Sequence, residues 1–122
     1  MFSILFVSHD ANLRAAAQRA LARKGFTVKT AAHSGHATLA LAGGSAINVL
    51  VIENQLPEGR GKDVAVRLRR YCRNLAVVVM CETRAFIPAD EITVVRPFTA
   101  DDLVDAIVNS AARQAFRGAT RL

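Results

Sequence analysis

Five polar side chains that could do chemistry stand at or just after the ends of apolar runs in this sequence. They are His9, Asp10, Glu53, Cys81 and Arg96. Carboxylates hold hard cations such as Mg²⁺, and they also pair with arginine, whose planar guanidinium can donate two hydrogen bonds to one carboxylate. Which of these chemistries applies depends on the elements that position the five side chains.

The same residues include the ligand types of a transition-metal site. His9, Asp10, Glu53 and Cys81 together offer an imidazole, two carboxylates and a thiolate. Their spacing matches no known zinc-ligand signature, so we do not expect such a site.

Short apolar runs alternate with segments of helical period along the chain. The runs predict five strands, at residues 4–7, 27–31, 49–52, 76–80 and 93–95. The helical segments are 11–25, 36–42, 62–72 and 99–114. Three of the runs are apolar throughout, which is typical of parallel strands covered on both faces. The alternation predicts an α/β fold with a doubly wound parallel sheet.

Two helix ends carry capping signals, and one connection is too short for a helix. Gly25 ends the first helical segment as a C-terminal cap, and Thr99 and Asp102 have capping-box spacing at the start of the last one. Between the fourth and fifth strands, residues 82–92 number only eleven and include Pro88. We expect a single helical turn or an irregular loop there.

Parallel strands bring their carboxyl ends to one edge of the sheet, where open α/β proteins bind ligands. His9, Asp10, Glu53, Cys81 and Arg96 should therefore meet in one shallow hollow. Simpler interpretations remain open for single residues. Glu53 could be an ordinary ion-pairing acid, His9 a solvated loop residue and Cys81 a buried thiol.

Composition indicates one globular domain. With 122 residues, of which 52% are hydrophobic, the chain is long enough for a single core. We expect that core in residues 3–113, followed by a basic tail, 114–122. The start lacks the pattern of a signal peptide, LAVVVMC is too short to span a bilayer, and the two cysteines form no CxxC pair. These features predict a cytoplasmic protein with reduced thiols and no membrane partner.

The net charge of +6 comes from 13 Arg and 3 Lys against 10 acids. One basic cluster is Arg60, Lys62, Arg67, Arg69, Arg70 and Arg73, and a second is Arg113, Arg117 and Arg121. A basic module that binds nucleic acid or a cyclic dinucleotide is one alternative function. Each cluster includes only one aromatic residue, Tyr71 or Phe116, which is fewer than a base-stacking surface needs, so nucleic acid is not the partner we expect.

From residue 3 to about residue 113, the sequence resembles the receiver domain of two-component response regulators. The supporting pieces are HD after the first strand, VLVIENQLPEGRG with Gly61, VVVMC, and VVRPF. The resemblance implies a flavodoxin-like five-stranded sheet of order 2-1-3-4-5 with helices on both faces, the helix between strands 4 and 5 being short or absent here.

In such receivers, acids after strands one and three hold Mg²⁺, and the aspartate after strand three accepts a phosphoryl group from a kinase histidine. The resemblance places Glu53 at this phospho-acceptor position and puts His9 and Asp10 in the acidic pocket. Cys81 stands where a hydroxyl residue contacts the phosphoryl group, Thr93 at the aromatic switch position, and Arg96 at the lysine.

These departures weaken the chemistry of the family. Glu53 has an extra methylene, which shifts the nucleophile by about 1 Å. His9 removes one hard oxygen ligand, so Mg²⁺ should bind weakly, if at all, to Asp10 and Glu53. Arg96 is well suited to hold the Glu53 carboxylate.

We therefore expect a stand-alone atypical receiver that is not an enzyme and needs no cofactor. It would act by binding a signalling protein such as a histidine kinase or a downstream regulator, and a homodimer stays open. The alternative within the family is a single-domain response regulator that still accepts phosphate.

Overall fold

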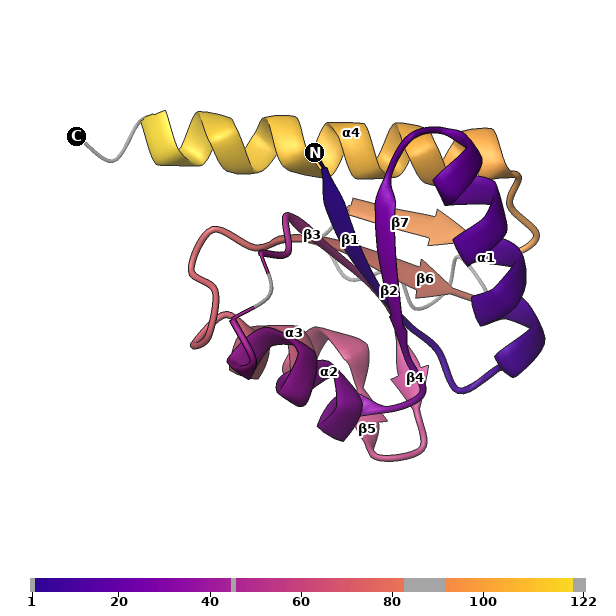
Figure 1. The fold of residues 1–122 in the computed structure, drawn as a ribbon, viewed down its shortest axis with the longest axis horizontal. Coiled ribbons are helices and arrows are strands. Elements are labelled where there is room, and N and C mark those ends of the chain that lie inside the picture. The colour runs from indigo at the N-terminus through magenta and orange to yellow at the C-terminus, as the bar shows by residue number, and fades with distance from the viewer. Residues whose placement is uncertain (1, 45, 83–91, 120–122) are drawn as a thin grey trace.

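A computed structural model of the chain describes residues 2–44, 46–82 and 92–119, with side chains only as far as residue 116 in the last range. Its centre is a five-stranded parallel sheet of order β2-β1-β3-β6-β7. Figure 1 labels these strands. The strands are β1 (Ser3–Val7), β2 (Thr27–Ala31), β3 (Val49–Glu53), β6 (Ala76–Cys81) and β7 (Ile92–Val95). The predicted fold and the order 2-1-3-4-5 are confirmed.

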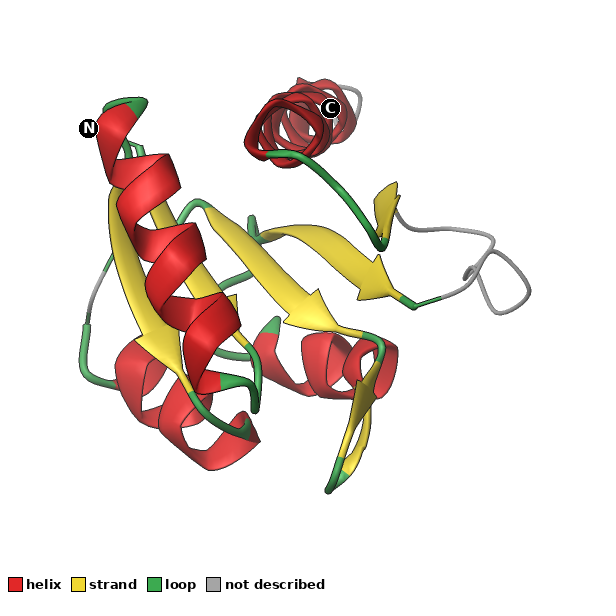
Figure 2. Cartoon of the chain, turned by 90° about the vertical axis from the view of Figure 1, so that its right-hand side faces the viewer, coloured by secondary structure: helices red, strands yellow, loops and turns green. Residues whose placement is uncertain are grey.

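Helices cover both faces of the sheet (Figure 2). They are α1 (Ala11–Arg23), α2 (Ser34–Ala42), α3 (Gly61–Leu68) and α4 (Ala100–Ala119). Successive strand residues point to opposite faces, so Leu50 and Ile52 pack with α2 and α3, whereas Val49 and Val51 pack with α1 and α4. The apolar run 49–52 is buried on both sides, which explains why it carries no polar alternation.

Both capping predictions are confirmed. Gly25 adopts a φ of 94° just after α1, a conformation that favours glycine. At α4 the Thr99 hydroxyl accepts from the Asp102 amide at 3.0 Å, and the Asp102 carboxylate accepts from the Thr99 amide at 2.9 Å. This reciprocal pair satisfies two amide donors where the helix begins.

Three boundaries differ from the prediction. Helix α3 ends at Leu68, not at residue 72, because the next turns tighten to i−3 hydrogen bonds such as Tyr71 N–H to Leu68 C=O at 3.0 Å. Helix α2 begins at Ser34, since the His33 side chain caps it. Helix α4 continues to Ala119, so the predicted tail starts within a helix.

A short antiparallel hairpin, β4 (Gln55–Leu56) and β5 (Gly59–Arg60), follows β3 and was not predicted. Gly59 has a φ of 143°, which side-chain-bearing residues rarely adopt. The prediction of a short or absent helix between the fourth and fifth strands falls on residues 83–91, outside the described residues. None of the helices that the structure describes is long and apolar enough to cross a membrane.

Candidate functional site

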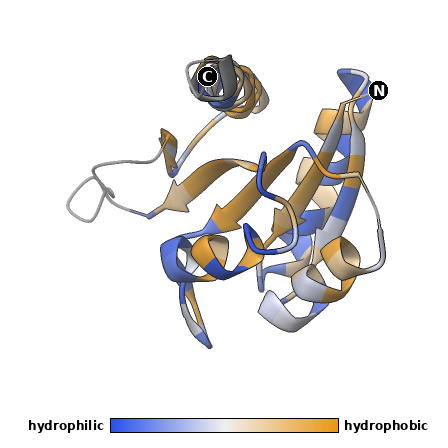
Figure 3. Ribbon diagram, turned by 90° about the vertical axis from the view of Figure 1, so that its left-hand side faces the viewer, coloured by the Kyte–Doolittle hydropathy of each residue, from blue (hydrophilic) through white to orange (hydrophobic). Residues whose placement is uncertain are grey.

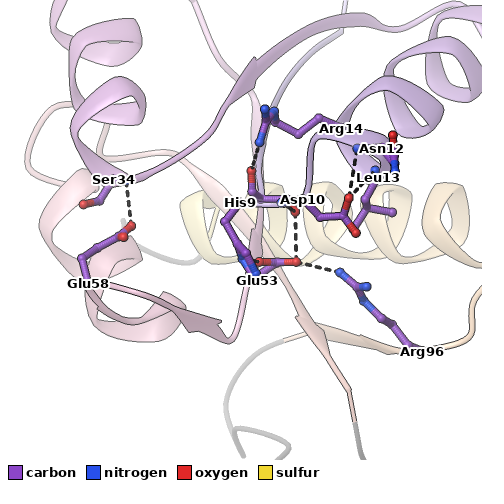
Figure 4. A network of polar contacts seen from close by, with 10 residues as sticks. His9, Asp10, Asn12, Leu13, Arg14, Ser34, Glu53, Glu58 and Arg96 are labelled. Atoms are coloured by element: carbon purple, nitrogen blue, oxygen red, sulfur yellow. Dashed lines mark hydrogen bonds and ion pairs between the residues drawn. The ribbon is translucent and has the colours of Figure 1, made fainter.

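The carboxylate of Glu53 is the centre of the site. Glu53 ends β3, and only 5% of the residue is exposed. Three side chains contact its two oxygens, as Figure 4 shows for the labelled residues. The Ser8 hydroxyl donates to Oε1 at 2.9 Å, Arg96 Nη2 donates to Oε1 at 2.6 Å, and His9 Nδ1 lies 2.6 Å from Oε2.

Strand order explains this convergence. β1 pairs directly with β3, so Ser8 and His9 leave the sheet beside Glu53. Arg96 follows β7, which is two strands away from β3, and its long side chain reaches across the end of β6. The Arg96 amide donates to the Cys81 carbonyl at 2.9 Å, which continues the pairing of β6 and β7 past the last strand residue. The Arg96–Pro97 peptide bond is cis.

The backbone of Gly61 packs closely against the backbone of Glu53 and Asn54. Its amide donates to the Asn54 carbonyl at 2.8 Å, and a Cβ at this position would lie 2.0 Å from the Glu53 carbonyl oxygen. No other residue fits there without a shift of the backbone, which gives a physical reason for Gly61 in the motif VLVIENQLPEGRG.

The centre of the site is a buried carboxylate, and each of its two oxygens has at least one hydrogen-bond partner. Glu53 carries a negative charge into the protein, which is costly unless donors and opposite charges surround it. Arg96 supplies the cation, with 32% of its side chain exposed, and His9 adds a ring of which 55% is exposed. Throughout the described part of the chain, every buried side-chain nitrogen or oxygen has a hydrogen-bond partner.

The contact between Arg96 and Glu53 is not a bidentate ion pair. Arg96 reaches only Oε1 within hydrogen-bond distance, whereas His9 takes Oε2. The site therefore binds one carboxylate from two sides. This contact also replaces the simpler interpretation of His9 as a solvated loop residue only.

Ser8 is a member of the site that sequence reasoning missed. Its side chain is completely buried, and its hydroxyl oxygen accepts from the Asp10 amide at 3.0 Å while it donates to Glu53. Arg14 Nη1 donates to the Ser8 carbonyl at 2.7 Å. The available signal was its position, since Ser8 directly follows the buried run 4–7 and precedes His9.

Asp10 has a different role from the one that the resemblance implies. Its Oδ1 accepts from the amides of Asn12 at 2.9 Å and Leu13 at 3.1 Å, so it is the N-cap of α1. Among the described side chains, Asp10 makes no hydrogen bond with Glu53.

The residues present do not fit a Mg²⁺ site. Both oxygens of Glu53 already face donors, and Asp10 Oδ1 accepts from two amides at the start of α1. Among the described residues, no group of three or more His, Cys, Asp or Glu side chains could hold a metal ion. This finding also leaves the mixed transition-metal set without support.

A cavity of about 110 Å³ adjoins the carboxylate. His9, Glu53, Met80, Cys81 and Arg96 are among the residues that line it. Burial raises the pKa of the Cys81 thiol, which therefore stays protonated and unreactive at neutral pH.

Four of the five side chains singled out from the sequence thus line this cavity, whereas Asp10 is not among its lining residues. Thr93 lies within β7, opposite Val79 in the register of β6, and is not among the described residues around the cavity.

Comparisons with known proteins support the fold. No family model and no curated protein matches the sequence. A response regulator receiver domain protein from Clostridium thermocellum is 22% identical with a TM-score of 0.79, over 95% of this chain and 98% of its own. A CheY-like receiver domain protein from Methanospirillum hungatei JF-1 is 16% identical with a TM-score of 0.81, over 96% and 98%.

A third structure is the response regulator TrrA from Thermotoga maritima, which was solved in complex with Mg(2+)-BeF. It is 21% identical with a TM-score of 0.78, over 90% of this chain and 99% of its own. The chain thus has the CheY-like flavodoxin fold of response regulator receiver domains. At these identities the likeness concerns the fold, and the chemistry of the site has to be argued from its own residues.

Proposed function

We propose that this chain is an atypical receiver domain of two-component signalling that binds other proteins and is not phosphorylated in the usual way. The observation that supports it is the engagement of both Glu53 oxygens by Ser8, Arg96 and His9. Glu53 comes from the end of β3, where the resemblance places the phospho-acceptor.

Phosphoryl transfer needs an accessible nucleophilic oxygen and cations that neutralise the transferred group. Here the Glu53 side chain is only 7% exposed, and its cation, Arg96, already pairs with it. Glu53 acts as a permanent anion that holds Arg96 in one position, and the domain works by presenting one conformation to a partner. The partners we propose are signalling proteins, either a histidine kinase or a downstream regulator.

The test is incubation of the protein with Mg²⁺ and acetyl phosphate, followed by intact mass measurement. A conventional receiver domain in the same reaction is the positive control. We expect no phosphoryl adduct on this chain. An adduct that disappears in Glu53→Gln would overturn the proposal and establish the phosphorylatable response regulator.

A further inference from the structure

A groove of about 260 Å³ lies between α2 and α3. The two helices are neighbours on one face of the sheet (Figures 1 and 3). Its floor is apolar, because Val64 and Leu68 of α3 line it and are each only 1% exposed. On the α2 side, Ser34 and Thr38 contribute hydroxyl groups. The groove therefore combines an apolar base with polar walls.

The rim of this groove carries two arginines and a tyrosine. Arg67, Arg70 and Tyr71 line it, and 55% of Tyr71 is exposed. Within the described part of the chain, neither guanidinium makes a hydrogen bond or an ion pair. Two exposed cations and an exposed aromatic ring thus border one hollow, and the Glu53 site uses none of them.

Basic residues outnumber acidic ones in the segment that forms one side of the groove. Between residues 60 and 73 the chain has six basic residues and a single acid, Asp63. At the start of α2 the Ser34 amide already donates to the Glu58 carboxylate at 2.9 Å. An incoming anion would therefore meet Arg67 and Arg70, while Glu58 occupies the helix end.

We infer that this groove binds an acidic segment of a partner protein. Arg67 and Arg70 hold carboxylates of that segment, and the base of the groove together with Tyr71 takes a neighbouring apolar side chain. A peptide fits better than a nucleic acid, because strand binding needs a series of phosphate contacts and stacked bases, whereas one aromatic residue borders this hollow. The inference rests on the proposed function, in which the domain acts by binding.

The test measures fluorescence anisotropy of a labelled synthetic peptide in which glutamate and leucine alternate, added to the full chain. The double variant Arg67→Gln/Arg70→Gln removes the rim cations. The control Lys62→Gln/Arg73→Gln removes the same charge from exposed positions outside the groove. We expect about a tenfold loss of affinity for the first and less than about threefold for the second.

Equal losses in the two double variants would show attraction by net charge only and would overturn the inference. So would the absence of binding to the unmodified chain. Single-stranded DNA serves as a second probe, and tighter binding of DNA than of the peptide, with a steep fall as salt rises, would assign the arginines to nucleic acid. Amide NMR should place the peptide shifts at Ser34, Thr38 and Tyr71.

The experiments can refute either proposal independently of the other. A phosphoryl adduct together with groove-specific peptide binding would refute the proposed function but leave the groove. No adduct together with equal losses in both variants would refute only the groove.

Discussion

At the scale of single residues, the three partners of the Glu53 carboxylate should stabilise it to different extents. Arg96 supplies a full charge and is one-third exposed, Ser8 supplies a buried neutral donor, and the His9 ring is more than half exposed. Because Glu53 is buried, removing the charge of Arg96 should lower the free energy of unfolding more than removing the charge of Glu53.

We expect Arg96→Met to lower the free energy of unfolding by about 2 kcal/mol, because it leaves the buried Glu53 without its cation. Glu53→Gln should cost about 1 kcal/mol, since the amide keeps the Ser8 contact and Arg96 can turn to water. Urea unfolding of both single variants and of the double variant measures the coupling. Strictly additive losses would mean that the pair contributes no interaction energy.

The two cysteines should react very differently with iodoacetamide. Cys81 is 2% exposed and burial raises its pKa above the ordinary 9.0, whereas Cys72 is partly exposed. Mass spectrometry at neutral pH should find Cys72 labelled first. The stability that comes from burying the neutral Cys81 thiol is fully present below pH 9.0. It is lost as the pH rises through the elevated pKa of Cys81. Labelling of Cys81 in the folded chain at the rate of Cys72 would contradict its burial.

At the scale of elements, the start of α3 holds the site in place through a close backbone approach. We expect Gly61→Ala to lower the free energy of unfolding by about 1–3 kcal/mol, because its Cβ would lie 2.0 Å from the Glu53 carbonyl oxygen. The control is Gly43→Ala, whose Cβ would come no closer than 3.1 Å to another heavy atom. Thermal unfolding compares the two, and equal losses would argue against the close approach.

Helix α2 begins with an unusual cap, a histidine. His33 Nδ1 accepts from the amides of Gly35 at 3.1 Å and His36 at 3.3 Å, which it can do only while that nitrogen is unprotonated. We expect His33→Ala to cost about 1 kcal/mol and to speed hydrogen exchange in α2, while His33→Asp keeps the cap.

His36→Ala is the matched control for this cap. It removes the His36 ring, whose centroid lies 3.9 Å from that of the His33 ring, but leaves the acceptor His33 Nδ1 in place. If His36→Ala destabilises α2 as much as His33→Ala does, stacking of the rings and not capping holds the start of the helix.

At the scale of the whole molecule, stability depends on a sheet that is buried from both sides. We expect Leu50→Ala, at a completely buried position of the central strand, to lower the free energy of unfolding by about 2–5 kcal/mol. Leu39→Ala, at a position 71% exposed on α2, should change it by less than about 0.5 kcal/mol. Similar losses from urea unfolding would contradict the described packing.

Much of this arrangement could be predicted from the sequence. Buried parallel strands need short β-branched runs, and helices need a 3.6-residue repeat, so both leave local patterns. The meeting of Glu53, Cys81 and Arg96 at one cavity followed from the chain order alone, because parallel strands share an edge for their carboxyl ends. Ser8 was missed because a serine at a strand end carries no charge pattern to mark it.

The sequence by itself determined the order of strands and helices, and with it the edge where the charged residues gather, because alternating apolar runs and helical repeats bury both faces only in a wound parallel sheet. Only the tertiary structure decided that Asp10 caps α1, that His9 and Arg96 divide the two oxygens of Glu53, and that a groove opens between α2 and α3. Hydrogen-bond partners depend on side-chain rotamers and on small differences in backbone position, which leave no periodic trace in a sequence.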